Sequence, residues 1–273
     1  MLRVQCVIVG QRLPFGQPAV GAFQRYELKY LVDRTAVPAL RATLAQHLEL
    51  DCHGGPSGYD VCSVYYDSPG LEFYWDRIEG RPFRRKLRVR HYGDGSAVDG
   101  DTTVYVEIKV QVDRVTEKRR VPLPYRLAIQ LCDGREMVKH SAADGGFLAE
   151  VLRLVSRLDL RPVTTVGYRR EAFVGRGADR ELRVTLDHRV RGRAWDHRLD
   201  AAAEDRPIVP PARCILEIKA IGRIPYWIID LATRAHLPMV RVSKYGQSVE
   251  HFGRAPRSVF HVWDPADARD VAE

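Results

Sequence analysis

The chain has 273 residues, of which 45% are hydrophobic and 29% charged, a balance that is typical of a folded domain and excludes a mainly disordered chain. Lysine and arginine number 43 against 35 acidic residues, so the formal net charge is +8 and favours an anionic partner. The five cysteines are scattered without a CxxC pair, which argues against a zinc site or a disulfide framework.

The chain divides into three parts by composition. Proline and glycine punctuate residues 1–22, which we expect to form an irregular lead-in; residues 23–253 are expected to form the globular domain and residues 254–273 a peripheral tail. No apolar run reaches the length of a membrane span, and the first ten residues are too short for a signal peptide core. We therefore expect a cytoplasmic protein.

Strands dominate the globular part and do not alternate regularly with helices, a pattern that predicts an α+β fold with an antiparallel sheet. The apolar spacing predicts helices over 37–48 after a Thr35 cap, over 71–77, over 147–155, and over 227–237 following Pro225. Eight strands are expected, at 25–32, 59–66, 85–92, 103–110, 114–121, 164–174, 182–190 and 213–221.

Side chains on these strands separate by parity, because successive residues of a strand point to opposite faces of a sheet. The strand at 85–92 places Lys86, Arg88 and Arg90 on one face, backed by apolar residues on the other. An acid and a base share one face in three further strands, as ELK at 27–29 and as EIK at 107–109 and 217–219. Charged side chains therefore gather on one face of several strands.

Two interpretations fit this pattern. One wet face of an ordinary sheet, with surface ion pairs worth well under about 1 kcal/mol each, is the simpler. The polar faces are, however, rich in Arg and Lys and poor in neutral polar residues, so a bound polyanion, carboxylates or a metal must offset their repulsion if they converge. We predict a closed or nearly closed antiparallel β-barrel of about eight strands, with a charged lumen and helices packed outside.

The residue types in this lumen indicate phosphate chemistry. Arginine binds phosphate oxygens bidentately and lysine acts as a point charge. The carboxylates of Glu27, Glu107 and Glu217 are suited to a hard divalent cation such as Mg²⁺ or Mn²⁺. The sequence has no P-loop, no GxGxxG loop and no evident Ser-His-Asp or Cys-His set, so phosphate binding should rest on side chains.

With these elements in place, residues 23–247 resemble the VTC catalytic domain, a polyphosphate polymerase of the CYTH-like or triphosphate tunnel metalloenzyme superfamily. The order and spacing of several stretches together make the resemblance specific. The matching stretches are RYELKY at 25–30, VYYDSP at 64–69, KLRVRHYG at 86–93, VYVEIK at 104–109, VTEKRR at 115–120, GYRREAF at 167–173, LRVTLD at 182–187, ILEIK at 215–219 and RVSKYG at 241–246.

The resemblance implies a role for particular residues. Glu217 falls at the family's metal-binding carboxylate, with Glu27 and Glu107 in support, and Tyr168 at a tunnel tyrosine. Arg241, Ser243 and Lys244 fall on a phosphate-contacting element of the last helix. The basic positions that grip the triphosphate and the growing chain are Lys29, Arg88, Arg90, Lys109, Lys118, Arg170 and Arg183. Arg88, Arg90, Lys109, Arg170 and Lys244 are the candidate catalytic set.

The implied reaction is transfer of the γ-phosphoryl group of ATP to inorganic polyphosphate, with Mn²⁺ or Mg²⁺ as cofactor. The expected partners are ATP and polyphosphate rather than nucleic acid, together with a membrane-associated protein at the inner face of the membrane. Two departures stand out: Arg25 replaces the first acid of an ExExK strand, and Arg241 replaces a lysine. The alternatives are a triphosphatase or polyphosphatase of the same fold, and a non-catalytic module that binds nucleotide, polyphosphate or RNA.

Overall fold

The computed structural model describes residues 25–263 except 53, 56, 94–96 and 114. Its strands are β1 (Arg25–Asp33), β2 (Leu48–Leu50), β3 (Tyr59–Asp67), β4 (Phe83–Gly93), β5 (Thr103–Val112), β6 (Val115–Pro124), β7 (Arg161–Gly175), β8 (Arg183–Arg193), β9 (Arg206–Pro207) and β10 (Arg213–Ile221). Its α-helices are α1 (Val37–His47), α2 (Glu72–Ile78), α3 (Tyr125–Cys132), α4 (Gly145–Arg157), α5 (Tyr226–Arg234) and α6 (Lys244–His251). Short 3₁₀ turns occupy Arg34–Ala36 and Gly177–Asp179.

The strands form one antiparallel sheet in the order β1-β10-β8-β7-β3-β4-β5-β6, with β2 paired to β7 and β9 to β8. All eight predicted strands are present, which confirms the α+β fold with an antiparallel sheet. The helix predicted after Thr35 begins at Val37, and Thr35 lies inside the preceding 3₁₀ turn, so the predicted cap is wrong. Helix α3, which follows directly on β6, was not predicted.

Hydrogen bonds do not close the sheet into a barrel within the described residues. The outer edge of β1 is already occupied, because the amide of Leu31 donates to the carbonyl of Pro238 at 3.1 Å and the amide of Val240 donates to Lys29 at 2.8 Å. Those backbone groups are therefore satisfied without β6. The sheet nevertheless curls far enough for side chains of β1 and β5 to meet, since Lys109 Nζ lies 3.5 Å from the Glu27 carboxylate.

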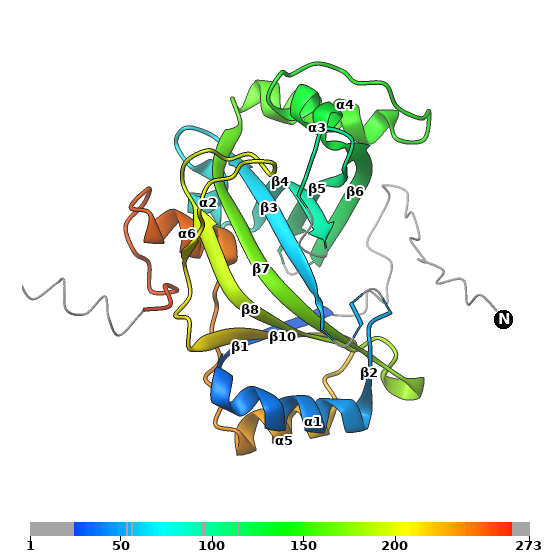
Figure 1. The fold of residues 1–273 in the computed structure, drawn as a ribbon, viewed down its shortest axis with the longest axis vertical. Coiled ribbons are helices and arrows are strands. Elements are labelled where there is room, and N and C mark those ends of the chain that lie inside the picture. Colours follow the sequence, from blue (N-terminus) through cyan, green and yellow to red (C-terminus); the bar gives the residue numbers. More distant parts are fainter. Residues whose placement is uncertain (1–24, 53, 56, 94–96, 114, 264–273) are drawn as a thin grey trace, which may run out of the picture.

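Helices cover the outer face of the curled sheet (Figure 1). Helices α3 and α4 lie together at one end over β5 and β6, and α1 and α5 lie side by side at the other end. Val106 and Ile108 of β5 are buried with Leu148 and Val151 of α4 in one apolar cluster. Burying such a side chain contributes about 1.5 to 3 kcal/mol, so the apolar strand positions face the helices and the alternate polar positions are left inside.

The predicted lead-in at residues 1–22 lies outside the described residues. Of the predicted tail, His261 and Val262 are buried against α6, where the Gln247 amide donates to the Val262 carbonyl at 2.9 Å. The three-part division of the chain stays a prediction. No helix in the part of the chain that the structure describes is long and apolar enough to cross a membrane.

Candidate functional site

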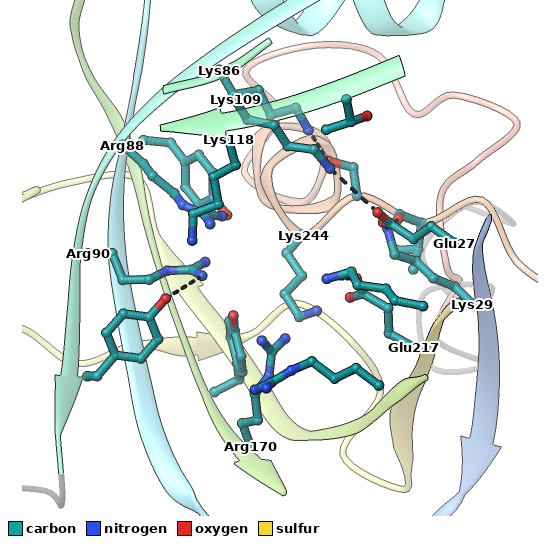
Figure 2. Close-up of a pocket in the computed structure, with 18 of the residues that line it drawn as sticks. Glu27, Lys29, Lys86, Arg88, Arg90, Lys109, Lys118, Arg170, Glu217 and Lys244 are labelled. Atoms are coloured by element: carbon teal, nitrogen blue, oxygen red, sulfur yellow. Dashed lines mark hydrogen bonds and ion pairs between the residues drawn. The ribbon is translucent and has the colours of Figure 1, made fainter. Parts of the chain in front are cut away.

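The inner face of the curled sheet encloses a cavity of about 2190 Å³. Strand parity brings the charged positions of β1, β4, β5, β6, β7, β8 and β10 to its surface, and α6 closes part of it with Lys244. Figure 2 looks into this cavity, with Arg90 on one side, Glu27 and Glu217 on the opposite side, and Lys244 between them. For β1, β4, β5 and β10, the face on which the sequence analysis placed the charged residues is the face that lines the cavity.

The strands β4, β5 and β6 carry what we call the arginine wall: Arg88, Arg90, Lys118 and Arg120 around Glu107. The Glu107 carboxylate is buried and lies 2.6 Å from both Arg88 and Lys118, and 3.9 Å from Arg120. Burial acts to raise the pKa of Glu107, but the charges of Arg88, Arg90 and Lys118 outweigh it and bring the pKa to about 2. Glu107 is therefore ionised and shared among several cations.

Arg90 is the most enclosed member of the arginine wall. It is 4% exposed, and its guanidinium donates to Ser63 Oγ at 2.9 Å and to the Tyr92 hydroxyl at 3.4 Å. These partners are neutral, so they fix the direction of the guanidinium without cancelling its charge. The arginine wall keeps an excess of positive charge toward the cavity.

The strands β1 and β10 carry what we call the mixed wall: Glu27, Lys29, Glu217 and Lys219. Their register sets Lys29 opposite Glu217 and Glu27 opposite Lys219, which makes a checkerboard of charge. Within each strand, Lys29 lies 2.7 Å from Glu27 and Lys219 lies 2.6 Å from Glu217. Burial acts to raise the pKa of Glu217, but Lys219, Lys29 and Lys244 lower it well below its ordinary value. Both acids of this wall are therefore ionised.

A third group, the Asp187 cluster, joins β7, β8 and α6 and consists of Asp187, Arg170, Lys244 and Tyr168. Arg170 donates to both carboxylate oxygens of Asp187, at 2.6 and 2.8 Å, and Lys244 Nζ lies 2.5 Å from the same carboxylate. The Lys244 ammonium also lies 4.7 Å from the Tyr168 ring centroid. The cluster ties α6 to the sheet and presents two cations to the cavity.

The remaining predicted residues lie toward the edges of the cavity. Arg183 is paired with Asp51 at 2.6 Å, and Arg241 places its guanidinium 4.6 Å from the Phe260 ring. Ser243 is the N-cap of α6, where its hydroxyl oxygen accepts from the Gly246 amide at 3.4 Å and from Lys86 Nζ at 2.9 Å. Every predicted basic residue, together with Tyr168 and Ser243, lines the cavity or its edge.

Three residues were not assigned a role from the sequence, although the strand pattern carried a signal for each. Arg120 shares its face with Lys118, so parity alone could have found it. Parity did place Lys86 beside Arg88, but no role was assigned to it. Asp187 shares its face with Arg183, yet its partners come from β7 and α6 and no spacing indicates them. Arg119, which has the opposite parity, points outward and pairs with Glu150 of α4 at 2.6 Å.

A divalent cation fits the mixed wall. Burial and the charge of the nearby Glu217 act to raise the pKa of Glu27. The charges of Lys29, Lys109 and Lys219 outweigh them and lower this pKa to about 2. Mg²⁺ and Mn²⁺ commonly bind one or two carboxylates and take further oxygens from phosphates. No group of three or more metal-ligating side chains gathers among the described residues, so ligands from a substrate would be needed as well. Glu27 and Glu217 are each paired with lysine as well, so a bound cation would compete with these ammonium groups. Glu107 is the more heavily paired acid, since Arg88, Lys118 and Arg120 all lie within 4.0 Å of it.

The fold and the site define a class, an antiparallel α+β domain that encloses a strongly cationic cavity bearing a few carboxylates. Residues 24–252 match the family described as the VTC domain. The chain therefore belongs to the VTC domain family, as the resemblance in its sequence predicted.

Vacuolar transporter chaperone complex subunit 4 of Schizosaccharomyces pombe is 24% identical over 260 residues, covering 79% of this chain and 35% of the relative. The chain thus spans about a third of that relative's length. Two solved structures, both of proteins provisionally assigned as adenylate cyclases, are also similar. The one from Vibrio parahaemolyticus has a TM-score of 0.41 and 13% identity over 83% of this chain and 98% of its own. The one from Bacillus halodurans has a TM-score of 0.46 and 10% identity over 84% and 98%.

Proposed function

We propose that this chain is a metal-dependent polyphosphate polymerase, which transfers the γ-phosphoryl group of ATP to a growing chain of inorganic phosphate inside the cavity. One observation carries the proposal. Sixteen of the described residues that line the cavity are lysine or arginine, whereas two, Glu27 and Glu217, are acidic. Such an excess of positive charge favours a bound anion of high charge, and ATP and polyphosphate are anions of that kind.

Phosphoryl transfer depends on positioning and charge neutralisation, which is what this lining supplies. In the proposed reaction, a terminal phosphate oxygen of the chain forms a bond to Pγ of ATP, and the bond from Pγ to the β,γ-bridging oxygen breaks, so ADP leaves. Arg88, Arg90 and Arg170 hold non-bridging oxygens, because their guanidinium planes are already fixed by neighbouring side chains. Lys109 and Lys244 add point charges to the same space.

Most of the remaining predicted residues contact other phosphates of the same chain. Lys29, Lys118 and Arg183 contact phosphates further along the chain, and Arg241 and Ser243 do so where the cavity meets α6. We assign Glu107 to the arginine wall, where it orients Arg88 and Lys118. Tyr168 holds Lys244 and Arg170 against its ring face.

Mn²⁺ or Mg²⁺ is the proposed cofactor, held by Glu217 with Glu27 in support. When bound, such an ion neutralises charge on the phosphate oxygens that it contacts. The lysines of the mixed wall keep both carboxylates ionised and ready for a cation. The proposed location is the cytoplasmic side of a membrane, and the proposed protein partner is membrane-associated. That the relative from S. pombe is by name a subunit of a complex supports the existence of a partner.

The test is incubation of the purified protein with ATP and Mn²⁺ or Mg²⁺, followed by measurement of ADP, orthophosphate and long phosphate chains. Long chains with matching ADP support the proposal. Orthophosphate without chains identifies a hydrolase of the same fold, and the absence of any product leaves a binding module. Charge reversal at Arg88 should abolish chain synthesis, whereas reversal at Arg198, which is exposed and paired with Asp200 away from the cavity, should leave it unchanged.

A further inference from the structure

One lysine of the cavity differs from the others in its partners. Lys86 of β4 has no carboxylate within 4.0 Å among the residues that the structure describes, and its Nζ donates instead to Ser243 Oγ at 2.9 Å. The other cavity lysines each have a carboxylate: Lys29 and Lys109 have Glu27, Lys118 has Glu107, Lys219 has Glu217 and Lys244 has Asp187. Lys86 is thus a cation site that lacks its counter-charge.

The charged groups that face Lys86 are cations, and they make a positive charge on Lys86 less favourable still. Arg77 of α2, Lys109 of β5, Lys29 of β1 and Arg88 of β4 all act on it with the same sign of charge. Burial and these four cations lower the pKa of Lys86 well below its ordinary value. The nearby acids do not relieve it, because Glu107 is held by Arg88 and Lys118, and Glu27 by Lys29 and Lys109.

Ser243 completes the local arrangement on the side of α6. Its oxygen accepts from Lys86 and from the Gly246 amide, so its own hydroxyl proton is left to donate. Both side chains lie at the surface of the cavity. An anion at this point would meet two side chains that can donate to it, the hydroxyl of Ser243 and the amino group of Lys86.

We propose that Lys86 is a further phosphate-binding residue of the cavity and that it takes up a proton from solvent as the polyanion binds. The inference rests on the proposed function only in so far as the cavity binds phosphate chains. A bound phosphate supplies the counter-charge that Lys86 lacks, and the ammonium that forms then donates to it. By linkage, the affinity for the anion rises as the pH falls through the window between the lowered pKa of the free protein and the higher pKa of the complex.

The experiment is titration calorimetry of the metal-free protein with tripolyphosphate at a series of pH values, at each in two buffers of different ionisation enthalpy. The difference between the two measured heats gives the protons taken up on binding. We expect the native protein to take up a substantial fraction of a proton, up to about one, per bound ligand through Lys86. Lys86→Arg should bind at least as tightly and lose this uptake, because a guanidinium stays charged in the free protein.

Two further variants separate this role from a general effect on the cavity. Lys86→Met should also lose the uptake and should bind about tenfold more weakly at lower pH, where the native lysine is charged. If Lys86→Arg folds poorly, the loss of proton uptake can be measured on Lys86→Met instead. Lys219→Arg is the matched control, because Lys219 lines the same cavity but already has Glu217 as its partner and is not among the cations that act on Lys86. This control should keep the uptake of the native protein.

Equal proton uptake by the native protein and Lys86→Arg overturns the inference while leaving the proposed function intact. Failure of tripolyphosphate to bind at all overturns both. Binding with the expected difference in proton uptake, but without chain synthesis from ATP, supports the role of Lys86 and removes the polymerase assignment.

Discussion

The arginine wall and the mixed wall lie on opposite sides of the cavity (Figure 2). They differ in how their buried charges are paired. In the arginine wall, three cations share the single carboxylate of Glu107 and Arg90 has only neutral partners, so charge is left over. In the mixed wall, two lysines alternate with two glutamates and the charges balance. An unbalanced wall favours a bound anion, whereas a balanced wall with two hard oxygen donors can also accept a cation. Under the proposed function, phosphate binding therefore falls chiefly on the arginine wall and metal binding on the mixed wall.

Acid should produce the largest effect. The pKa values of Glu107 and Asp187 are both lowered to about 2 in the folded protein, from ordinary values of about 4. Their contribution to stability is therefore present above about pH 4 and is lost as the pH falls toward 2. We expect the free energy of unfolding to fall by about 4 kcal/mol between pH 4 and pH 2, at about 1.36 kcal/mol per pKa unit. Urea denaturation at a series of pH values measures it.

The two walls predict different acid profiles for two variants. Glu107→Gln should flatten the acid dependence strongly, and Glu27→Gln should flatten it less, because the Glu27 side chain is 29% exposed and partly screened by water. Equal flattening in both variants would contradict the distinction between the walls.

Glu107→Gln should also destabilise the protein at neutral pH. The substitution leaves Arg88, whose side chain is 18% exposed, without its carboxylate in a largely buried setting, a change that typically costs about 3 kcal/mol. Lys118 also loses this partner but is more exposed. Tripolyphosphate should recover much of this loss, because it restores negative charge beside the cations. Thermal unfolding with and without tripolyphosphate checks both parts. A loss that the ligand does not recover would show that Glu107 acts through packing and not through charge.

Glu217→Gln tests the mixed wall. We expect chain synthesis in the presence of Mn²⁺ to fall by about 100-fold, since one ligand of the proposed metal is lost while the shape of the side chain is kept. Tripolyphosphate binding without metal should stay within about threefold of the native value, because the cations of the arginine wall are untouched. Turnover assays and calorimetry give the two readouts. Full turnover in this variant would remove the metal assignment.

The smallest effect should come from exchanging one kind of cation for the other. Arg88→Lys should weaken tripolyphosphate binding by about tenfold, because an ammonium cannot reproduce the fork that contacts Glu107 and Tyr65. The reverse exchange in the mixed wall, Lys219→Arg, should change binding by less than about threefold. Comparable losses in both variants would mean that net charge, and not guanidinium geometry, decides binding.

Much of the fold and of the site could be predicted from the sequence. Each of the eight strands was predicted to within a few residues, and parity placed Arg88, Lys109 and Glu217 on inward faces. The prediction of a closed barrel failed at the outer edge of β1, where a segment distant in the chain takes the place of a strand. The backbone of β1 bonds to residues 238–240, so the expected ring of strands is not closed by hydrogen bonds in the described residues. Nothing in the pattern of either segment indicates that pairing.

The sequence by itself determined which side chains share a face, because the alternation of side chains along a strand is a local property of the extended backbone. It also determined the excess of positive charge on those faces. Only the tertiary structure decided which partner each charged side chain has. That Asp187 is shared by Arg170 and Lys244, and that Lys86 is left with a serine, follows from sheet curvature and from the position of α6. These partners lie far apart in the chain, so their distances depend on how the sheet and α6 pack together, which no local spacing encodes.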